Sequence, residues 1–399
     1  MQPQSIAIIG AGTAGLATAA LLAEQGHHIT LIERAEALAP VGAGLLLQPT
    51  GLSVLKEMGL YQAMLGYGAR VDALVGHTRE GRRIMNTTYR SLDAHSHGLG
   101  VHRASLCHVL DQHLHTLPHQ RLMDCTVSVV ETLADHATVI AEQAGEPCRL
   151  SFDAVLIANG SHSRLRPAAW TRYDRLYPWG AMWAMQPMVE SFAAPLLQQR
   201  YHQAGQMAGI LPTGCRPDQP EQALASFFWS LPVAQMNDWQ HPDFDFAGWR
   251  QQALTLWPQL ESVLAPLTHQ KQLLPATYRD VIMHHWGENR LGIIGDAAHA
   301  MSPQLGQGAN MALLDARALG QAVANTDNWP QAWAHYHRQR EPQIRFYQRM
   351  SRWLTPAFQS HSRTVSTGRD LFFPIMERVP WLRMQMAKTV AGRKCSLLD

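Results

Sequence analysis

The feature that most constrains the fold is a glycine cluster near the N-terminus, Gly10-Ala11-Gly12-Thr13-Ala14-Gly15. It follows the apolar run Ile6–Ile9 and precedes the apolar segment Leu16–Gln25, so the order strand, tight turn and helix is predicted. Glycines at these spacings allow the turn, close approach of the backbone to a pyrophosphate, and close helix packing. The helix N-terminus adds free N–H groups and partial positive charge. We therefore expect Gly10, Gly12, Ala14 and Gly15 to bind a dinucleotide.

A carboxylate follows the second predicted strand, His28–Ile32. Glu33 lies 18 residues beyond Gly15, where it can accept hydrogen bonds from ribose hydroxyls and would repel the 2′-phosphate of NADP. Arg34, the next residue, is assigned to the same site. A glycine-rich turn can also be purely structural, and a bare Rossmann unit serves NAD as well as FAD, so this motif alone does not identify the cofactor.

A second motif about 285 residues downstream, Gly295-Asp296-Ala297-Ala298-His299, follows the predicted buried strand Leu291–Ile294. Ligands of open α/β sheets bind beside the carboxyl ends of strands, which is where Asp296 lies. Pro303 and the run Gly306-Gln307-Gly308-Ala309-Asn310 come next, before a helix predicted from about Asn310 to Ala324. Backbone N–H groups at the start of this helix can stabilise negative charge on a ligand.

With Val101–Leu106 and Asp153–Arg166 between them, these motifs resemble the single-component FAD-dependent aromatic hydroxylases, a flavoprotein monooxygenase family that includes p-hydroxybenzoate, salicylate and 3-hydroxybenzoate hydroxylases. The resemblance spans nearly the whole chain. It implies FAD as cofactor, with NAD(P)H and O2 as co-substrates. The implied activity is hydroxylation of an aromatic or polycyclic small molecule through a flavin C4a-hydroperoxide.

The resemblance also implies roles for particular residues. Asp296 would hydrogen-bond the ribityl chain, Arg103 would lie near the ribityl and pyrophosphate groups, and Pro303 would lie beside the reactive edge of the isoalloxazine. The flavin-edge backbone of Pro303, Gly306 and Gly308 is assigned to catalysis, without a side-chain base. The further residues assigned to the cofactor are Asn159, Gly160, Gln307, Ala309 and Asn310, together with Gly306 and Gly308.

One position departs from the family pattern. The family usually has Asp-Gly where this chain has Asn159-Gly160, a pair associated with holding both FAD and NAD(P)H. Asparagine keeps the size and hydrogen-bonding ability of aspartate without its charge. FAD binding is therefore expected, whereas the choice among NADH, NADPH and another reductant stays open.

The predicted fold is α/β, with a Rossmann-like FAD-binding domain, an interleaved and mostly β substrate domain, and a C-terminal helical segment. The FAD-binding domain is assigned to residues 1–70, 98–167 and 276–340, and the aromatic-rich substrate domain to 71–97 and 168–275. Residues 341–399 are predicted to be helical. There, Met376–Ala391 is a candidate basic amphipathic helix, and packing on the protein is favoured over contact with a membrane.

The composition of the chain limits the expected cellular location of the protein and the partners it can bind. The 33 basic and 31 acidic residues give a net charge of +2 without long runs of one sign, so no nucleic-acid surface is expected. The first strand begins within about five residues of Met1, and no apolar run reaches the roughly 18 residues of a membrane span. Five scattered cysteines without a CxxC pair indicate a reducing cytoplasm. A small aromatic substrate is the expected partner, and a homodimer stays open.

The sequence also bears on other functions. The 21 dispersed histidines lack ligand spacing, so no metal is expected. A flavin-dependent halogenase would need a WxWxIP signature, which Trp179-Gly180-Ala181-Met182-Trp183 does not match. An FAD-dependent dehydrogenase or reductase of the same fold, and a non-catalytic flavin-binding partner protein, remain the alternatives to a monooxygenase.

Overall fold

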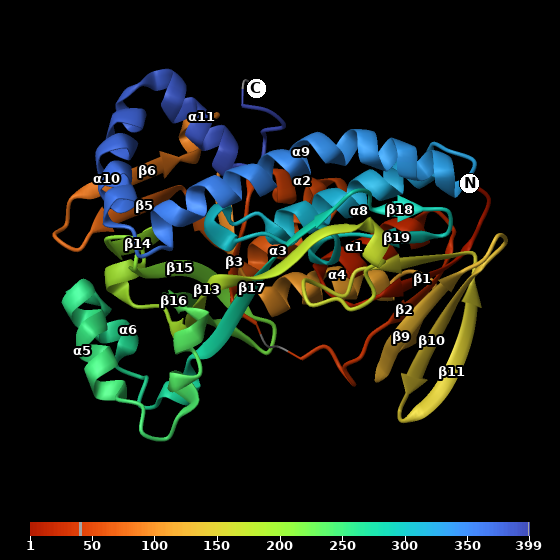
Figure 1. Cartoon of the computed structure of the whole chain (residues 1–399), viewed down its shortest axis with the longest axis horizontal. Coiled ribbons are helices and arrows are strands. Elements are labelled where there is room, and N and C mark those ends of the chain that lie inside the picture. Colours follow the sequence, from red (N-terminus) through yellow and green to blue (C-terminus); the bar gives the residue numbers. More distant parts are fainter. Residues whose placement is uncertain (40–41, 398) are drawn as a thin grey trace.

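The computed structural model describes residues 1–39, 42–397 and 399. Its nucleotide-binding part is a six-stranded sheet in the order β18-β19-β12-β1-β2-β8, in which only the β18–β19 pair is antiparallel (Figure 1). The strands are β1 (Ser5–Ile9), β2 (His28–Ile32), β8 (His119–Leu122), β12 (Ala154–Ile157), β18 (Gly287–Glu288) and β19 (Leu291–Ile293). The central strands β1 and β12 are almost wholly buried, as expected for parallel strands covered on both faces.

Helices and a β-meander cover this sheet. The helix α1 contacts both α4 and α8, and α8 also contacts α2 and α9. The helices are α1 (Thr13–Glu24), α2 (Pro49–Glu57), α3 (Tyr61–Tyr67), α4 (Arg103–His115), α7 (Asp296–His299) and α8 (Gly308–Ala324). The antiparallel meander consists of β9 (Cys125–Thr132), β10 (Ala137–Gln143) and β11 (Glu146–Phe152).

A second sheet of seven strands has the order β17-β13-β16-β15-β14-β5-β6. It contains β5 (Ala73–Thr78), β6 (Arg83–Thr88), β13 (Thr171–Pro187), β14 (Leu196–His202), β15 (Gln206–Arg216), β16 (Gln219–Pro232) and β17 (Leu274–Met283). The short helices α5 (Phe246–Leu256) and α6 (Glu261–Leu264) follow β16. The expected domain boundary at residue 275 cuts through β17, because this strand pairs with β13 along most of its length before the chain returns to the first sheet.

A small sheet in the order β3-β7-β4 lies between the two larger ones. Its strands are β3 (Gly44–Leu47), β4 (Ala69–Val71) and β7 (Gly98–His102). Two glycines allow it to approach the second sheet closely: a Cβ on Gly100 would lie 1.8 Å from the Pro212 carbonyl oxygen, and one on Gly44 would lie 2.4 Å from Thr213 Cγ2. The two domains therefore meet through direct backbone contact.

The C-terminal region is helical, with α9 (Trp329–Phe358), α10 (Arg363–Arg378) and α11 (Pro380–Val390). In Figure 1, α9 runs across the molecule above α8, and α10 and α11 lie at the end that carries β5 and β6. The prediction of one helix over Met376–Ala391 is wrong. Val379 has φ −88° and ψ 113°, the extended conformation favoured before proline, and Pro380 starts a new helix. No helix among the described residues is both long enough and apolar enough to cross a membrane.

Candidate functional site

A single large cavity runs from the Gly10–Gly15 turn to the C-terminal helices. Its volume is about 2120 Å³. Sites for one small molecule span about 300–1,000 Å³, so this cavity has room for a dinucleotide cofactor together with a second ligand. Both glycine motifs of the sequence line it, which brings together segments almost 300 residues apart.

The glycines of the first motif have distinct roles in the structure. Gly10 has φ +106°, and a Cβ there would lie 2.7 Å from Asn159 Cα. A Cβ on Gly15 would lie 1.9 Å from the Gly10 carbonyl oxygen, so Gly15 serves the close packing of α1. A Cβ on Gly12 would meet only Arg103 Nη2, at 4.0 Å, and would otherwise project into open space. Gly12 therefore leaves room for a ligand, whereas Gly10 and Gly15 shape the turn.

Glu33 and Arg34 line the same end of the cavity. The Glu33 carboxylate accepts hydrogen bonds from the backbone N–H groups of Ala11, at 2.8 Å, and Ala35, at 3.0 Å. Each carboxylate oxygen can accept a further bond, so the fixed carboxylate still has capacity for ribose hydroxyls. Arg34 is exposed at the rim.

Asp296 lies at the start of α7, immediately after β19 and Gly295, and it faces the cavity. The protein atoms packed around it raise the pKa of its carboxyl, while His299, Arg103 and Arg166 oppose this rise. A carboxyl in this position can pair with polyol hydroxyl groups. Arg103, the first residue of α4, also lines the cavity, which brings the two predicted partners of a ribityl chain into one region.

A buried ionic cluster lies next to Asp296 in the structure, and the sequence analysis did not predict it. Asp315, on α8, accepts hydrogen bonds from Gly295 N at 2.8 Å and Arg340 Nε at 2.8 Å, and lies 2.6 Å from His299 Nε2. All three side chains are 4% exposed or less. Desolvation alone would raise the pKa of Asp315, but His299 and Arg340 hold it well below its ordinary value. The sequence feature that could have indicated this cluster was an aspartate within the apolar helix predicted after Asn310.

The loop before α8 presents backbone to the cavity. Pro303, Gly306, Gln307, Gly308 and Ala309 all line it, and Gly306 adopts a left-handed conformation with φ +59°. The helix α8 begins at Gly308, so its unpaired N–H groups and the positive end of its dipole lie at the cavity. Contact of these residues with a cofactor stays a prediction.

Asn310 differs from the expectation. It is fully buried, and its amide bonds to protein: Oδ1 accepts from Gln48 N at 2.7 Å, while Nδ2 donates to the carbonyl oxygens of Leu46 and Gly306. The Asn310 side chain therefore fastens the loop at Gly306 to the end of β3, and the assignment of this residue to the cofactor stays a prediction. The physical reason is that these backbone groups need hydrogen-bond partners once they are buried.

Gln48 is a cavity residue that sequence reasoning missed. It is fully buried, and its Oε1 accepts a hydrogen bond from the Tyr89 hydroxyl at 2.5 Å. This bond leaves Gln48 Nε2 buried without a partner, 3.7 Å from where a Cβ on Gly306 would lie. A buried donor without a partner is costly and indicates a bond to a ligand. No sequence motif marks this glutamine.

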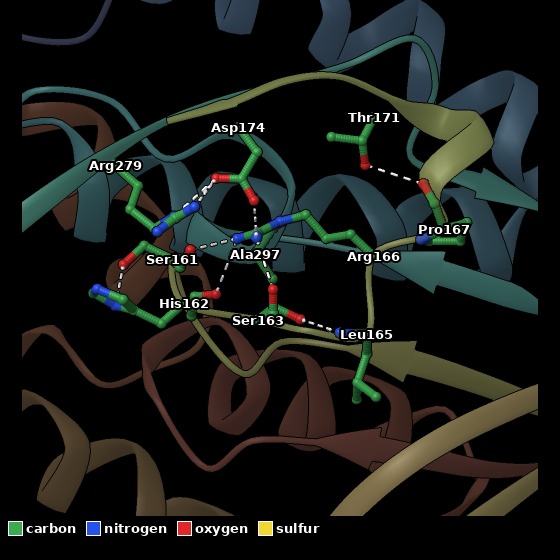
Figure 2. A network of polar contacts seen from close by, with 11 residues as sticks. Ser161, His162, Ser163, Leu165, Arg166, Pro167, Thr171, Asp174, Arg279 and Ala297 are labelled. Atoms are coloured by element: carbon green, nitrogen blue, oxygen red, sulfur yellow. Dashed lines mark hydrogen bonds and ion pairs between the residues drawn. The ribbon is translucent and has the colours of Figure 1, made fainter. Parts of the chain in front are cut away.

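The loop after β12 is fixed by Arg166 (Figure 2). Its guanidinium donates to the carbonyl oxygens of Ser161, Ser163 and Ala297 and pairs with Asp174 at 3.0 Å. Asn159 and Gly160, which begin this loop, line the cavity beside the Gly10 turn. Arg166 thus connects the loop that begins at Asn159-Gly160, where the chain departs from the family pattern, to the carbonyl group of Ala297, the residue after Asp296.

The neutral far wall of the cavity comes from the seven-stranded sheet, which also contributes the paired Asp174 and Arg279 to the lining. Burial raises the pKa of Tyr278 to about 12, so its hydroxyl stays protonated near neutral pH. Tyr201 lines the cavity, whereas Tyr177 and His202 of the same sheet lie outside the lining formed by the described residues. The wall consists of Leu74, Met85, Thr87, Ala181, Trp183, Leu197, Gln199, Tyr201, Met207, Leu211, Ser226, Phe228, Ala276 and Tyr278.

These observations fit FAD. The open space at Gly12, the carboxylates of Glu33 and Asp296, the helix start at Gly308 and the unpaired donor of Gln48 supply complementary groups along one continuous cavity. Within residues 1–39, 42–397 and 399, no group of three or more His, Cys, Asp or Glu side chains is placed to hold a metal ion.

Comparison with known proteins agrees with this geometry. A family model described as "FAD binding domain" matches residues 4–349. The chain is 27% identical to the 3-amino-4-hydroxybenzoate 2-monooxygenase of Streptomyces cremeus, covering 92% of this chain and 90% of that protein. It is 27% identical to the 2-heptyl-3-hydroxy-4(1H)-quinolone synthase of Mycobacteroides abscessus, covering 82% and 84%.

A solved structure shows the same fold. A variant of Klebsiella pneumoniae HpxO complexed with FAD has a TM-score of 0.80 and 20% identity, covering 98% of this chain and 99% of that one. The α/β fold with a β-rich second domain and C-terminal helices is thereby confirmed, as is the predicted resemblance. The chain belongs to the FAD-binding-domain family, that of the FAD-dependent flavoprotein monooxygenases.

Proposed function

We propose that this protein uses NAD(P)H and O2 to hydroxylate an aromatic or polycyclic small molecule. The observation that carries the proposal is the single cavity that joins the dinucleotide turn and the Gly306–Ala309 loop to a neutral wall rich in aromatic and methionine side chains. An apolar wall suits a planar ring and excludes water from the reaction.

The chain's own residues would divide the work along the cavity. Glu33 would bind the adenosine ribose, and Gly12 would leave room for the pyrophosphate. Asp296 and Arg103 would hold the ribityl chain, while the N–H groups at the start of α8 would stabilise negative charge on the ring. Bound FAD would supply electron transfer and oxygen activation.

The electron donor is part of the proposal. Asn159 lines the cavity where the family usually carries a charged aspartate, so this chain lacks one negative charge beside the cofactor turn. A reductase or dehydrogenase of the same fold that does not transfer oxygen is the second candidate, whereas the Asn159 departure bears on the choice of electron donor.

The first experiment is an anaerobic visible spectrum of the FAD-loaded protein before and after NADH or NADPH, with a panel of phenols and polycyclic aromatics. Bleaching of the flavin band that one panel compound accelerates would support hydride acceptance and reveal an effector. Aerobic turnover under oxygen-18 gas then decides between the candidates. Labelled product supports the monooxygenase, and oxidised product without label supports the dehydrogenase.

A further inference from the structure

The C-terminal helices extend the cavity beyond the flavin region to the molecular surface. Trp353, Phe372 and Trp381 all line the cavity, yet their side chains are 66%, 55% and 57% exposed. Residues that face both the cavity and solvent mark its opening. The opening therefore lies at the end of α9 and at the junction of α10 and α11.

We propose that this opening binds an extended apolar tail on the substrate, so that the aromatic head reaches the flavin region and the tail lies along α10 and α11. The proposal rests on the proposed function, because it names the substrate class of the same site. The tail would contact Phe372, Met376, Trp381 and Met386, which all line the cavity between the surface and the inner wall.

Hydrogen bonds attach the α10–α11 hairpin to the rest of the protein at both ends. The segment between these attachments is therefore the part that can adjust its position around a ligand. At the α10 end, Arg369 donates to the carbonyl oxygens of Ala357, at 2.8 Å, and Gln203, at 3.0 Å. At the α11 end, Gln307 Nε2 donates to the Val390 carbonyl oxygen at 2.8 Å, so the hairpin is tied to the loop before α8. Between these two attachments lie the exposed aromatic side chains.

Charge supports an uncharged ligand. Among the described residues, the seven-stranded sheet contributes two charged side chains to the cavity lining, Asp174 and Arg279, which are paired with each other, and its other lining residues are neutral. The remaining arginines of the lining, Arg34, Arg103, Arg164 and Arg166, come from the nucleotide-binding part of the chain. Lys394, at the outer end, donates to Gln385 and to the Leu397 carbonyl oxygen. A carboxylate that lies against the neutral residues of the sheet wall would therefore lose its hydration without gaining a cation there.

A membrane or a second copy of the chain would account for the exposure of these aromatic residues but not for their continuity with the cavity. Leu371 and Ile375 are 60% and 53% exposed on the same helix and are not part of the lining. These neighbours provide matched controls, because a flat partner would contact them as it contacts Phe372.

The test is calorimetric titration of the FAD-loaded protein with 4-alkylphenols from methyl to heptyl, and with 4-alkylphenols that carry a ring carboxylate. The dissociation constant is expected to fall about four-fold for each methylene that becomes buried. The carboxylated compounds are expected to bind at least ten-fold more weakly than their neutral counterparts. A dissociation constant independent of chain length overturns the proposal.

Variants then locate the tail. Phe372→Ser and Trp381→Ser are expected to flatten the dependence on chain length, whereas Leu371→Ser leaves it unchanged. The two variants are compared in alkylphenol binding and in sedimentation with anionic vesicles. If Phe372→Ser and Leu371→Ser had equal effects in either assay, the tail site would be overturned in favour of a surface partner. Because each substituted side chain is more than half exposed, folding should be retained.

The outcomes separate this inference from the proposed function. Reduction by NAD(P)H and labelled product, together with a flat binding series, leave the monooxygenase intact and remove the tail site. A steep binding series without reduction by either nicotinamide nucleotide keeps the tail site and removes the proposed electron donor.

Discussion

Arg166 Nη1 donates to Asp174 Oδ2 across 3.0 Å, and this ion pair joins the loop after β12 to the first residues of β13. Asp174 also pairs with Arg279 of β17, with Nη2 and Oδ1 2.6 Å apart. The Arg166 side chain is only 4% exposed, while Asp174 is 26% exposed. One guanidinium thus connects the cofactor side of the cavity to the sheet that forms its far wall (Figure 2).

Arg166→Ala should destabilise the protein by about 2–4 kcal/mol, because it leaves buried carbonyl groups and part of Asp174 without partners. The flavin content should fall as well, since the carbonyl group of Ala297 beside Asp296 loses its donor. Urea unfolding and the ratio of flavin to protein absorbance measure both effects. Arg172→Ala changes an exposed arginine on β13, the strand that carries Asp174, and as the control it should change stability by less than about 0.5 kcal/mol. If Arg166→Ala and Arg172→Ala were equally stable, the proposed role of Arg166 in connecting the loop after β12 to β13 would be contradicted.

Asp315 predicts a dependence of stability on pH. Its folded-state pKa is lowered by His299 and Arg340, which outweigh desolvation. The stabilisation is therefore complete above the unfolded pKa, near 4, and is lost as the pH falls towards the lower folded pKa. Asp315→Asn should cost about 3–5 kcal/mol at pH 7 and reduce the slope of stability against pH below 4. Thermal melts from pH 3 to 7 test this, with exposed Asp327→Asn as control; identical pH slopes would refute it.

The sequence predicted the strands and turns that line the glycine-turn end of the cavity, because these depend on local patterns. The limits of β2 agree with the structure, and the glycine spacing at Gly10–Gly15 correctly anticipated α1. Partnerships across the chain could not be predicted, since Gln48 with Tyr89, or Asp315 with Arg340, meet only after folding. Even within a recognised motif, the partners of a side chain could not be predicted. Asn310 belongs to the second glycine motif, but its amide hydrogen-bonds to the backbone of Gln48 and Gly306.

Gln48 and Tyr89 allow binding and stability to be separated. The double variant Gln48→Leu with Tyr89→Phe removes both partners of one bond and the unpaired Nε2, so the apoprotein should be as stable as the parent or slightly more so. FAD or substrate should bind about five- to ten-fold more weakly, because a charge-free hydrogen bond is worth about 1 kcal/mol. Melting of the apoprotein and fluorescence titration with FAD measure the two effects. Unchanged affinity for both ligands would exclude Gln48 as a ligand donor.

Asp296→Ala should yield largely colourless protein. The Asp296 side chain is exposed in the cavity, so its loss removes no buried packing. The variant apoprotein should therefore melt close to the parent temperature while flavin content drops. Asp327→Ala serves again as the exposed control. Yellow Asp296→Ala protein with full flavin occupancy would remove Asp296 from the cofactor site.

Asn159→Asp tests the departure from the family pattern. Asn159 is exposed to the cavity beside Gly10, so a carboxylate there stays hydrated and should not disturb the fold. FAD should remain bound, and anaerobic reduction by NADH or NADPH should become faster because the charge that the family carries is restored. Asn159→Ala is the matched control, since it removes the amide without adding charge. Stopped-flow reduction that is slower in Asn159→Asp than in the parent would refute the idea that Asn159 weakens the use of nicotinamide nucleotides.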